Sequence, residues 1–399
     1  MQPSGCALSV RGSDRVRITP ELYLGVMSAG GMQIQSPFDV QRLGVIMRPD
    51  PSREEEVEGV LNPGAARGPD GRLYLFPRLV GPGNHSRIGI ARVVFDGDVP
   101  VGVERLGIAL EPEEPYELRP AEGTGGCEDP RVTYVAPIGL YVMAYVAWGP
   151  KGPRIAVAIS EDLLSWERLG LVDFQPDVEA RYSVIFNNYH NKDGAFVPTA
   201  LQMLDGTLAL ALIHRPLYET EDTAPKRIHE FVPSIWGSTC QLDAVKQDVR
   251  NLCVMKKHAL IAGPEHPWEA LRIGLGTPPV ETNLGFLTFY HGVSGEIARN
   301  PGERNRVNYV AGVMAFLREE QKMLEYRSSS PVLVPETEEE TQGVVDNVVF
   351  PTGVDDRGNG VLDVYYGMAD RFIGAVRVRL PKTLDYQERA LFEVERLER

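Results

Sequence analysis

The sequence contains few cysteines, no excess of basic residues and no long apolar segment. Four cysteines among 399 residues, with no CxxC pair, argue against a disulfide framework and against a zinc site. The formal net charge of −14 makes nucleic acids and anionic membrane surfaces poor partners. No segment approaches the roughly 18 consecutive apolar residues of a membrane span, and the first residues lack the apolar centre of a signal peptide. We therefore expect a cytoplasmic protein that binds no membrane.

Several catalytic signatures are missing as well. The sequence has no GxSxG nucleophile elbow, no P-loop, no GxGxxG after a predicted strand and no HExxH. Cys127 stands beside Glu128 and Asp129, whose negative charges disfavour a reactive thiolate. We therefore expect no metal and no organic cofactor.

Short alternating or apolar segments dominate the sequence, and helical periodicity is scarce. Asp-Gly and other glycine turns separate many of these segments, as β-hairpins require. The pattern predicts an all-β protein. The clearest predicted strands are 72–80, 87–95, 139–148, 154–160, 207–215, 285–293, 307–317, 360–368 and 372–380.

Five of the predicted strands resemble one another: LYLFPR, LYVMAYVA, LALALIHRP, LTFYHG and LDVYYG. Their end residues, Arg78, Tyr145, Arg215, His291 and Tyr366, are separated by 67, 70, 76 and 75 residues. Five units of this length predict a five-bladed β-propeller, with the end residues converging on a central channel. A pair of β-sandwiches with accidental spacing is the alternative.

The sequence predicts a single domain in three segments. Residues 1–60 form an N-terminal extension or closing segment, with a proline-rich start and an acidic patch, PSREEEVEG. Residues 61–380 form the propeller core. Residues 381–399 contain LDYQERALFEVERLER, which predicts a short charged C-terminal helix.

The stretch GTGGCEDPRVT, residues 123–133, places two carboxylates in a glycine-rich turn at the start of a strand. A carboxyl group beside another carboxylate can have a raised pKa and act as a general acid. Cleavage of a glycosidic bond needs such an acid to protonate the leaving oxygen. Asp129 is therefore a candidate catalytic residue. The alternative is a turn held by an ion pair between Asp129 and Arg131.

Cationic residues occur in four groups, three of which lie at or near the ends of strands of the repeated units. In an acidic protein, positive side chains that point into one channel would form an anion site, because arginine and lysine bind phosphate well and histidine adds a donor. For any one of them, an exposed position or a core histidine is the alternative. These residues are Lys192, His214, Arg215, Arg272 and His291.

A further set of polar residues could bind sugar hydroxyls, and Trp148, Tyr290 and Tyr366 could supply stacking platforms. The predicted substrate-binding set comprises Asn62, Arg78, Ser86, Arg87, Glu128, Arg131, Asp193, His214, Tyr290, Tyr366 and Asp370.

Taken together, these motifs resemble glycoside hydrolase family 130, the inverting β-mannoside phosphorylases and their hydrolase relatives. The resemblance runs from about residue 60 to 380. It rests on LNPG, the FPR strand end, HSRIGIA, GCEDPRVT, NKDGAFVP with HRP, IGLGTPPVET with GFLTFYHG, VLVPE with NVVFPTG, and YYGMAD. The resemblance implies a five-bladed β-propeller, in agreement with the repeat.

The resemblance also implies roles for individual residues. Asp129 matches the general acid, which in the family acts through a mannose hydroxyl. Arg272 falls where the family usually has lysine near the phosphate site. The mannose-binding positions match Asn62, Arg78 and Asp370, and the phosphate-binding positions match Lys192, Arg215 and His291.

The implied reaction is inverting phosphorolysis of a β-1,4- or β-1,2-linked mannoside, with inorganic phosphate as co-substrate. The products would be α-mannose 1-phosphate and a shorter sugar. Phosphate is already a nucleophile at neutral pH, so no protein base is required. The partners implied are an oligosaccharide, phosphate and further copies of the chain in a homo-oligomer.

Four departures from the family pattern concern the acceptor sugar and oligomer contacts more than the reaction type. Thr199 replaces an acid, Phe286 replaces a tryptophan, SIWGSTCQLD replaces the family's IWLSxSxDL, and 296–308 is an insertion. Two alternatives stay open. An inverting β-mannosidase would need a carboxylate base and would tend to lose the phosphate cations, and a non-catalytic sugar-binding propeller would not need Asp129.

Overall fold

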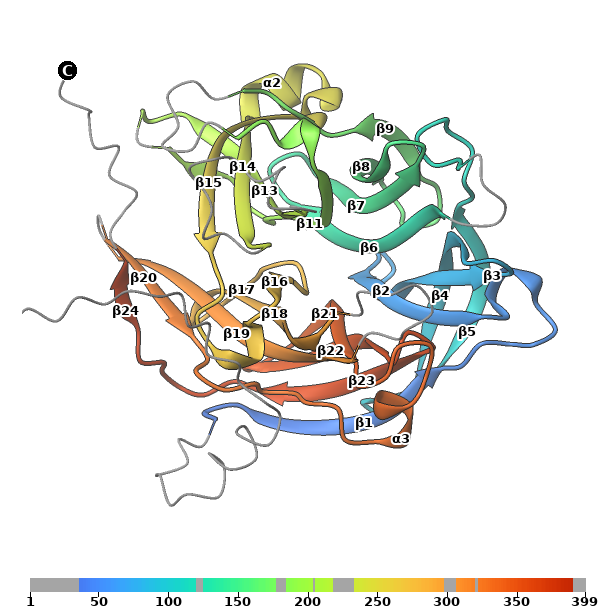
Figure 1. Cartoon of the computed structure of the whole chain (residues 1–399). Coiled ribbons are helices and arrows are strands. Elements are labelled where there is room, and N and C mark those ends of the chain that lie inside the picture. Colours follow the sequence, from blue (N-terminus) through green and yellow to red (C-terminus); the bar gives the residue numbers. More distant parts are fainter. Residues whose placement is uncertain are drawn as a thin grey trace, which may run out of the picture. The chain divides into compact units, whose positions relative to one another are not determined.

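The computed structural model describes residues 36–119, 125–176, 184–203, 205–217, 233–297, 306–319 and 322–389. These residues form a mostly-β fold of four hydrogen-bonded sheets (Figure 1). Two short α-helices lie among the strands, α2 (Leu242–Gln247) and α3 (Glu338–Thr341). In the described part of the chain, no helix is both long and apolar enough to cross a membrane.

The largest sheet consists of two four-stranded antiparallel units. Unit 1 contains β2 (Gly59–Arg67), β3 (Leu73–Gly81), β4 (His85–Asp96) and β5 (Val99–Leu110). Unit 2 contains β6 (Gly125–Val135), β7 (Leu140–Gly149), β8 (Gly152–Ser160) and β9 (Glu167–Leu171). A parallel pairing of only two residue pairs, between β4 and β6, joins the two units.

The other three sheets each contain one such unit. Unit 3 contains β11 (His190–Phe196), β13 (Leu208–Leu217), β14 (Ile235–Gln241) and β15 (Val254–Ala262), with β10 (Asp173–Phe174) and β12 (Leu201–Gln202) at its edges. Unit 4 contains β16 (Arg272–Leu275), β18 (Gly285–Glu296), β19 (Arg306–Glu319) and β20 (Lys322–Arg327), with β17 (Val280–Thr282) and β24 (Gln387–Arg389). Unit 5 contains β21 (Val349–Gly358), β22 (Val361–Met368) and β23 (Phe372–Arg379), and is completed by β1 (Asp39–Met47).

Local sequence explains the hairpins within the units. Between β21 and β22, Asn359 and Gly360 both have positive φ, the conformation that a tight two-residue hairpin turn requires. The five similar sequence segments fall on the second strand of each unit: β3, β7, β13, β18 and β22. The repeat read from the sequence is therefore a structural repeat.

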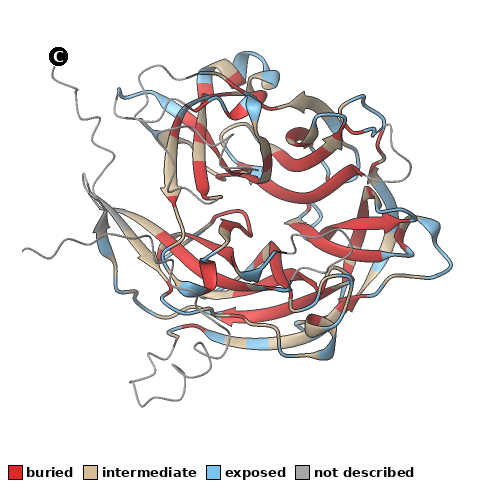
Figure 2. Cartoon of the chain, viewed as in Figure 1, coloured by how far each residue is buried: buried red, intermediate tan, exposed pale blue. Residues whose placement is uncertain are grey.

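Five apolar clusters lie between consecutive units, and the last closes on the first. Strand residues of neighbouring units share a cluster: Phe76 with Met143, Val142 with Leu212, and Ile213 with Ile273. Leu287 and Val364 belong to the cluster between units 4 and 5. The fifth cluster joins unit 5 to unit 1, so each unit packs against two others. Figure 2 shows the buried residues along the strands of every unit.

The C-terminal helix expected over 381–399 is wrong for residues 387–389, which form β24 and pair with β20. Leu384 and Tyr386, two positions apart, pack against the cluster of units 4 and 5. That period of two is typical of a strand and outweighs the helix propensity of the charged residues. Residues 390–399 lie outside the described part of the chain.

Candidate active site

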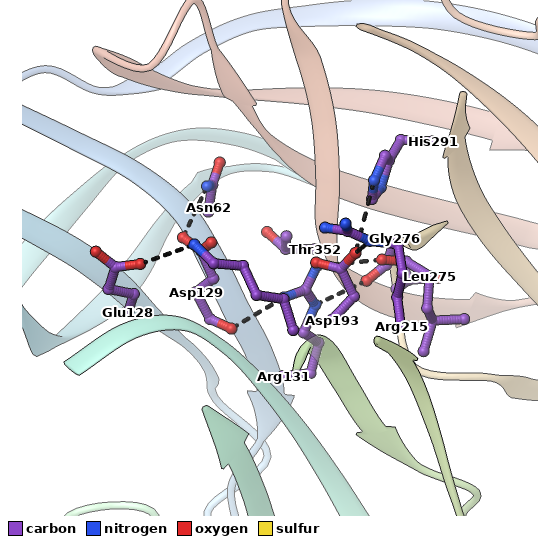
Figure 3. A network of polar contacts seen from close by, with 12 residues as sticks. Asn62, Glu128, Asp129, Arg131, Asp193, Arg215, Leu275, Gly276, His291 and Thr352 are labelled. Carbon is purple, nitrogen blue, oxygen red and sulfur yellow. Dashed lines mark hydrogen bonds and ion pairs between the residues drawn. The ribbon is translucent and has the colours of Figure 1, made fainter. Parts of the chain in front are cut away.

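Three polar residues stand at matching irregularities in the first strands of units 1 to 3. Asn62 in β2, Asp129 in β6 and Asp193 in β11 have φ values of 45°, 46° and 58°. At each, the register shifts so that two residues oppose one on the second strand. Such β-bulges re-aim side chains, and asparagine and aspartate tolerate positive φ better than most residues. The bulges therefore present one amide and two carboxylates from three neighbouring strands (Figure 3).

Asp129 is the centre of one half of the site, which we call the acid half. Its Oδ1 accepts hydrogen bonds from Asn62 Nδ2 at 2.8 Å and from Arg78 Nη1 at 3.2 Å. Arg78 also donates to Glu128 Oε1 at 2.7 Å, and its Nε donates to Ser86 Oγ at 2.9 Å. Among the described residues, Asp129 Oδ2 has no hydrogen-bond partner. One carboxylate oxygen is thus held while the other is left for a ligand.

Lys192 pairs with Arg215 between β11 and β13, but its ammonium group contacts the acid half. Its Nζ donates to Glu128 Oε2 at 3.2 Å and stands 4.6 Å from the ring centre of Trp148. Its charge also lowers the pKa of Asp129 and of Asp370. The acid half therefore contains Asn62, Arg78, Glu128, Asp129, Lys192 and Asp370.

Two carboxyl groups of the acid half have pKa values shifted in opposite directions. Burial raises the pKa of Asp129, but the charges of Arg78 and Lys192 outweigh it, and the net pKa lies below the ordinary value. Burial raises the pKa of Asp370 to about 6, assisted by the negative charges of Asp129 and Glu128. Two carboxyl groups whose pKa values are shifted in opposite directions are typical of acid–base sites.

The second half of the site, the anion half, is built around Asp193. Arg215 Nε donates to Asp193 Oδ2, and Arg131 Nη2 donates to Oδ1 at 3.3 Å. His291 Nε2 lies 3.6 Å from Oδ2, too far for a hydrogen bond (Figure 3). Burial raises the pKa of Asp193. The charges of Arg215, His291 and Arg131 lower it by more than burial raises it, so the net pKa is well below its usual range. Asp193 is therefore the ionised counter-charge of this half.

The anion half retains polar atoms without partners. Arg215 Nη1 and both ring nitrogens of His291 are buried with no hydrogen-bond partner among the described residues. Burial lowers the pKa of His291 to about 3, so its ring is neutral at pH 7 and carries one N–H donor. Unpaired buried donors are costly, and their clustering indicates an anion-binding site.

Gly274 keeps this space open. A Cβ at this position would lie 2.2 Å from Asp193 Oδ2 and 2.5 Å from His291 Cε1. Arg272, two positions earlier on the same face of β16, is half-buried, and its charge lowers the pKa of His291. The anion half thus comprises Arg131, Asp193, Arg215, Arg272 and His291.

Arg131 of the anion half also bonds to the backbone of the acid half and so connects the two. Its side chain is fully buried and donates to the backbone oxygens of Asp129, Leu275 and Gly276 at 3.0–3.1 Å. Its guanidinium carbon also lies 5.6 Å from the ring centre of Phe350. It therefore contacts residues of units 2 to 5, and its position suits fixing the bulge at Asp129 better than contacting a substrate.

Four other predicted substrate residues are not brought into the site. Arg87 forms an ion pair with Glu111. His214 lies in the core among Phe174 and Phe186, bonded to Asn191 and to Ser238 Oγ. The hydroxyls of Tyr290 and Tyr366 donate to the buried carboxylates of Glu269 and Glu340.

The expected convergence of the repeated strand ends is wrong for Tyr145 and Tyr366. Arg78 and Arg215 each pair with the residue that precedes the bulge of the first strand. Tyr145 instead lies opposite the bulge itself, so its position differs from theirs by one residue. A one-residue offset turns a strand side chain to the other face. There Tyr145 donates to Glu117, just as Tyr366 donates to Glu340.

The buried carboxylates belong to a recurring arrangement that sequence analysis missed. In units 2, 4 and 5, a glutamate before the first strand accepts two backbone N–H groups, a tyrosine hydroxyl and an arginine of the fourth strand. The groups are Glu117, Tyr145 and Arg168; Glu269, Tyr290 and Arg327; and Glu340, Tyr366 and Arg42. In the sequence, the ExxE and ExxxE spacings before the first strands of these units were the signal that could have indicated the buried glutamates.

Two aromatic residues beside His291 were also missed. The ring of Phe350 lies 4.5 Å from that of His291, and the half-buried Tyr309 lies 6.0 Å from it. Tyr309 follows the insertion at 296–308, which obscures its relation to the motifs. In the described residues, no group of three or more His, Cys, Asp or Glu side chains is arranged to hold a metal ion.

Comparisons with known proteins show the family to which the chain belongs. A family model described as beta-1,4-mannooligosaccharide phosphorylase matches residues 39–389. The chain is 28% identical over 343 residues to 1,2-beta-oligomannan phosphorylase from Thermoanaerobacter sp. (strain X514), covering 82% of this chain and 93% of the relative. It is 31% identical over 235 residues to beta-1,4-mannooligosaccharide phosphorylase from Ruminococcus albus, covering 59% of this chain and 64% of the relative.

A solved structure of beta-1,2-mannobiose phosphorylase from Listeria innocua, in complex with beta-1,2-mannobiose, has the same fold. Its TM-score is 0.60 at 22% identity, covering 85% of this chain and 96% of that one. Because the family model covers most of the chain, the protein belongs to glycoside hydrolase family 130, the β-mannoside phosphorylase family.

Proposed function

We propose that the protein catalyses inverting phosphorolysis of a β-mannoside, releasing α-mannose 1-phosphate and a shorter sugar. The observation that carries this proposal is the pairing of a half-free carboxylate, Asp129, with a separate cluster of unpaired donors on Arg215 and His291. We also propose that the five units are the blades of a five-bladed propeller, because each packs against two others and unit 5 closes on unit 1.

The charges of the two halves support this division of labour. In the anion half, Arg131, Arg215 and Arg272 carry three positive charges against one negative charge on Asp193. In the acid half, Arg78 and Lys192 face the carboxylates of Glu128, Asp129 and Asp370. A phosphate dianion is therefore attracted to the first half and repelled from the second.

In the proposed reaction the sugar to be transferred lies between the two halves. Asn62 and Arg78 hold Asp129 and are placed to contact hydroxyl groups, and Asp370 contributes a third polar group. Phosphate held by Arg215 and His291 attacks the anomeric carbon, the bond to the leaving oxygen breaks on the opposite face, and that oxygen takes the proton carried by Asp129.

Asp129 must be protonated to act as the acid, although its pKa is lowered in the unoccupied site. Two changes on substrate binding act in the required direction. The sugar removes water from the carboxyl group, and phosphate brings negative charge into the neighbouring half; both raise the pKa of an acid. Binding of both substrates would therefore precede proton transfer.

We propose for Lys192 a role other than the phosphate contact that the motif resemblance implied. Its ammonium group is paired with Glu128 and lies over Trp148, on the acid side of the site. We propose that it offsets the charges of Glu128 and Asp129. Phosphate binding then depends on Arg215, His291 and Arg272.

The test is synthesis in the reverse direction. The protein is incubated with α-mannose 1-phosphate and a panel of acceptors, namely glucose, mannose, N-acetylglucosamine and β-mannobioses, and release of inorganic phosphate is measured. Release that depends on one acceptor supports the proposal and identifies the leaving sugar. No release, together with liberation of mannose from β-mannosides in phosphate-free buffer, would overturn it in favour of an inverting β-mannosidase.

A variant separates the two halves in the same assay. Arg215→Ala removes a donor of the anion half, so we expect the KM for phosphate to rise by about 100-fold while that for the mannoside changes little. Equal changes in both constants would contradict the assignment of Arg215. Arg250→Ala, which removes an exposed arginine distant from these contacts, is the matched control.

A further inference from the structure

Trp148 differs from the other tryptophans of the chain. Trp236 is fully buried, Trp268 is 4% exposed, and Trp166 packs edge-on against Phe76. Trp148 is half-buried near the end of β7, opposite Gly126 of β6.

Two cationic groups surround the indole of Trp148. Lys192 Nζ lies 4.6 Å from the ring centre, and the guanidinium carbon of Arg119 lies 5.3 Å from it. Arg119 is exposed, and within the described ranges it has no carboxylate partner. Both cationic groups lie over the ring, so the indole has N–H donors close to it. An aromatic ring with neighbouring polar donors is a common arrangement for binding a sugar, whose ring has an apolar C–H face and a rim of hydroxyls.

The position of Trp148 relative to the two halves determines which sugar it would contact. Lys192 joins the indole to Glu128, and Glu128 shares Arg78 with Asp129. Trp148 therefore lies on the acid side. In an inverting displacement the nucleophile and the leaving group occupy opposite faces of the transferred sugar. With phosphate in the anion half, the leaving sugar lies on the side of Trp148.

We propose that Trp148 and Arg119 form the subsite for the leaving sugar, which is the acceptor in the reverse reaction. The inference rests on the proposed function for its direction. The ligand class is a neutral hexopyranose that stacks on the indole while Arg119 donates to its hydroxyls. Trp148 and Arg119 then determine specificity and take no part in bond making.

The kinetic test uses the reverse reaction with Trp148→Ala, Trp148→Phe and Arg119→Gln, and with Trp166→Phe as the matched control. We expect Trp148→Ala to raise the KM for the acceptor at least about 10-fold and to leave the KM for α-mannose 1-phosphate within about twofold. Trp148→Phe and Arg119→Gln should give smaller changes of the same kind, and the control none. Equal changes in both constants, or no change, would overturn the proposal.

A direct binding measurement distinguishes sugar stacking on Trp148 from a purely structural role in which Trp148 holds Lys192 in place. Tryptophan fluorescence is titrated with D-mannose, D-glucose and N-acetyl-D-glucosamine in the wild type and in Trp148→Phe. Stacking predicts a saturable change in the wild type that is absent from the variant. A change that persists in the variant, or no change in the wild type, would overturn the proposal.

The titration also separates this inference from the proposed function. If the wild type shows no phosphate-dependent activity but its fluorescence response is lost in Trp148→Phe, the reaction is wrong and the sugar subsite stands. If activity is present and neither the acceptor KM nor the fluorescence depends on Trp148, the reaction stands and the subsite is wrong.

Discussion

Asp129 and Asp193 occupy equivalent bulges in neighbouring strands, yet their surroundings differ. Each has positive φ, each is buried, and each has a lowered pKa. Asp193 has both oxygens bonded to arginines and is 1% exposed. Asp129 is bonded through Oδ1 alone and is 7% exposed.

This difference shows how one repeated backbone feature supports two roles. A carboxylate with both oxygens bonded to cations is a fixed counter-charge and cannot readily take up a proton. A carboxylate with one free oxygen can accept and return one. We therefore interpret Asp129 as the chemical group and Asp193 as the group that holds Arg131 and Arg215 in place.

The strongest test of the comparison is Asp129→Asn. The amide keeps the shape of the side chain but carries no transferable proton, so we expect kcat to fall by about 10²- to 10⁴-fold. Arg78 keeps its bond to Glu128, so the melting temperature should fall less than it does when the charge of Asp193 is removed. Steady-state phosphorolysis and thermal unfolding measure the two effects. A variant with more than about a tenth of wild-type kcat would exclude Asp129 as the acid.

Asp193→Asn should show the reverse pattern. Loss of this charge leaves Arg131 and Arg215 buried without a carboxylate, and removing one partner of a buried ion pair typically costs about 3–5 kcal/mol. We expect a large fall in the free energy of unfolding, measured by denaturant titration. A stable but inactive variant would mean that Asp193 takes part in the chemistry, and the comparison would fail.

Much of the fold was predictable because it depends on local patterns. Alternating segments and glycine turns predicted the strands, and the spacing of similar segments identified the second strand of each unit. The alignment was one residue out of step at Tyr145 and Tyr366, because similar aromatic ends hide the register. Register is fixed by pairing with the preceding strand and by its bulge, neither of which the second strand's sequence contains.

The site was predictable in part for a related reason. Asp129 stood out because two acids precede a proline within a glycine-rich turn. The role of Asp193 and the place of Lys192 depend on contacts between units, which no motif in one segment encodes. The tyrosine–glutamate clusters likewise join residues 21–28 positions apart, beyond the reach of hairpin and turn patterns.

Two glycine substitutions probe the halves separately. In Gly274→Ala the added Cβ would lie 2.2 Å from Asp193 Oδ2, and in Gly367→Ala it would lie 2.1 Å from Asn62 Oδ1. Displacing these groups by even a fraction of an ångström should cost on the order of 10- to 100-fold. We expect Gly274→Ala to raise the KM for phosphate and Gly367→Ala to impair kcat/KM for the mannoside. Initial rates with each substrate varied in turn distinguish the two, and the reverse assignment would contradict the division of the site.

The smallest expected effect concerns Asp370, which has no counterpart in the anion half. Its pKa in the folded protein is about 6, above the ordinary 3.8. The folded state therefore holds a proton that the unfolded state releases between about pH 4 and 6, so this group makes stability fall as pH rises through that window. Asp370→Asn cannot ionise and avoids this loss.

We therefore expect Asp370→Asn to match the wild type near pH 4 and to exceed it in stability above pH 6. At about 1.4 kcal/mol per pKa unit, a shift of about two units sets an upper limit of roughly 3 kcal/mol. Asp129 and Asp193 have lowered pKa values, so their effect on stability is opposite to that of Asp370. Their contribution to the free energy of unfolding is present above their unfolded pKa and is lost as pH falls below it. Thermal unfolding of both proteins from pH 4 to 8 measures the difference. A difference that stays constant across this range would mean that Asp370 titrates normally, and the acid half would then contain no proton-holding partner for Asp129.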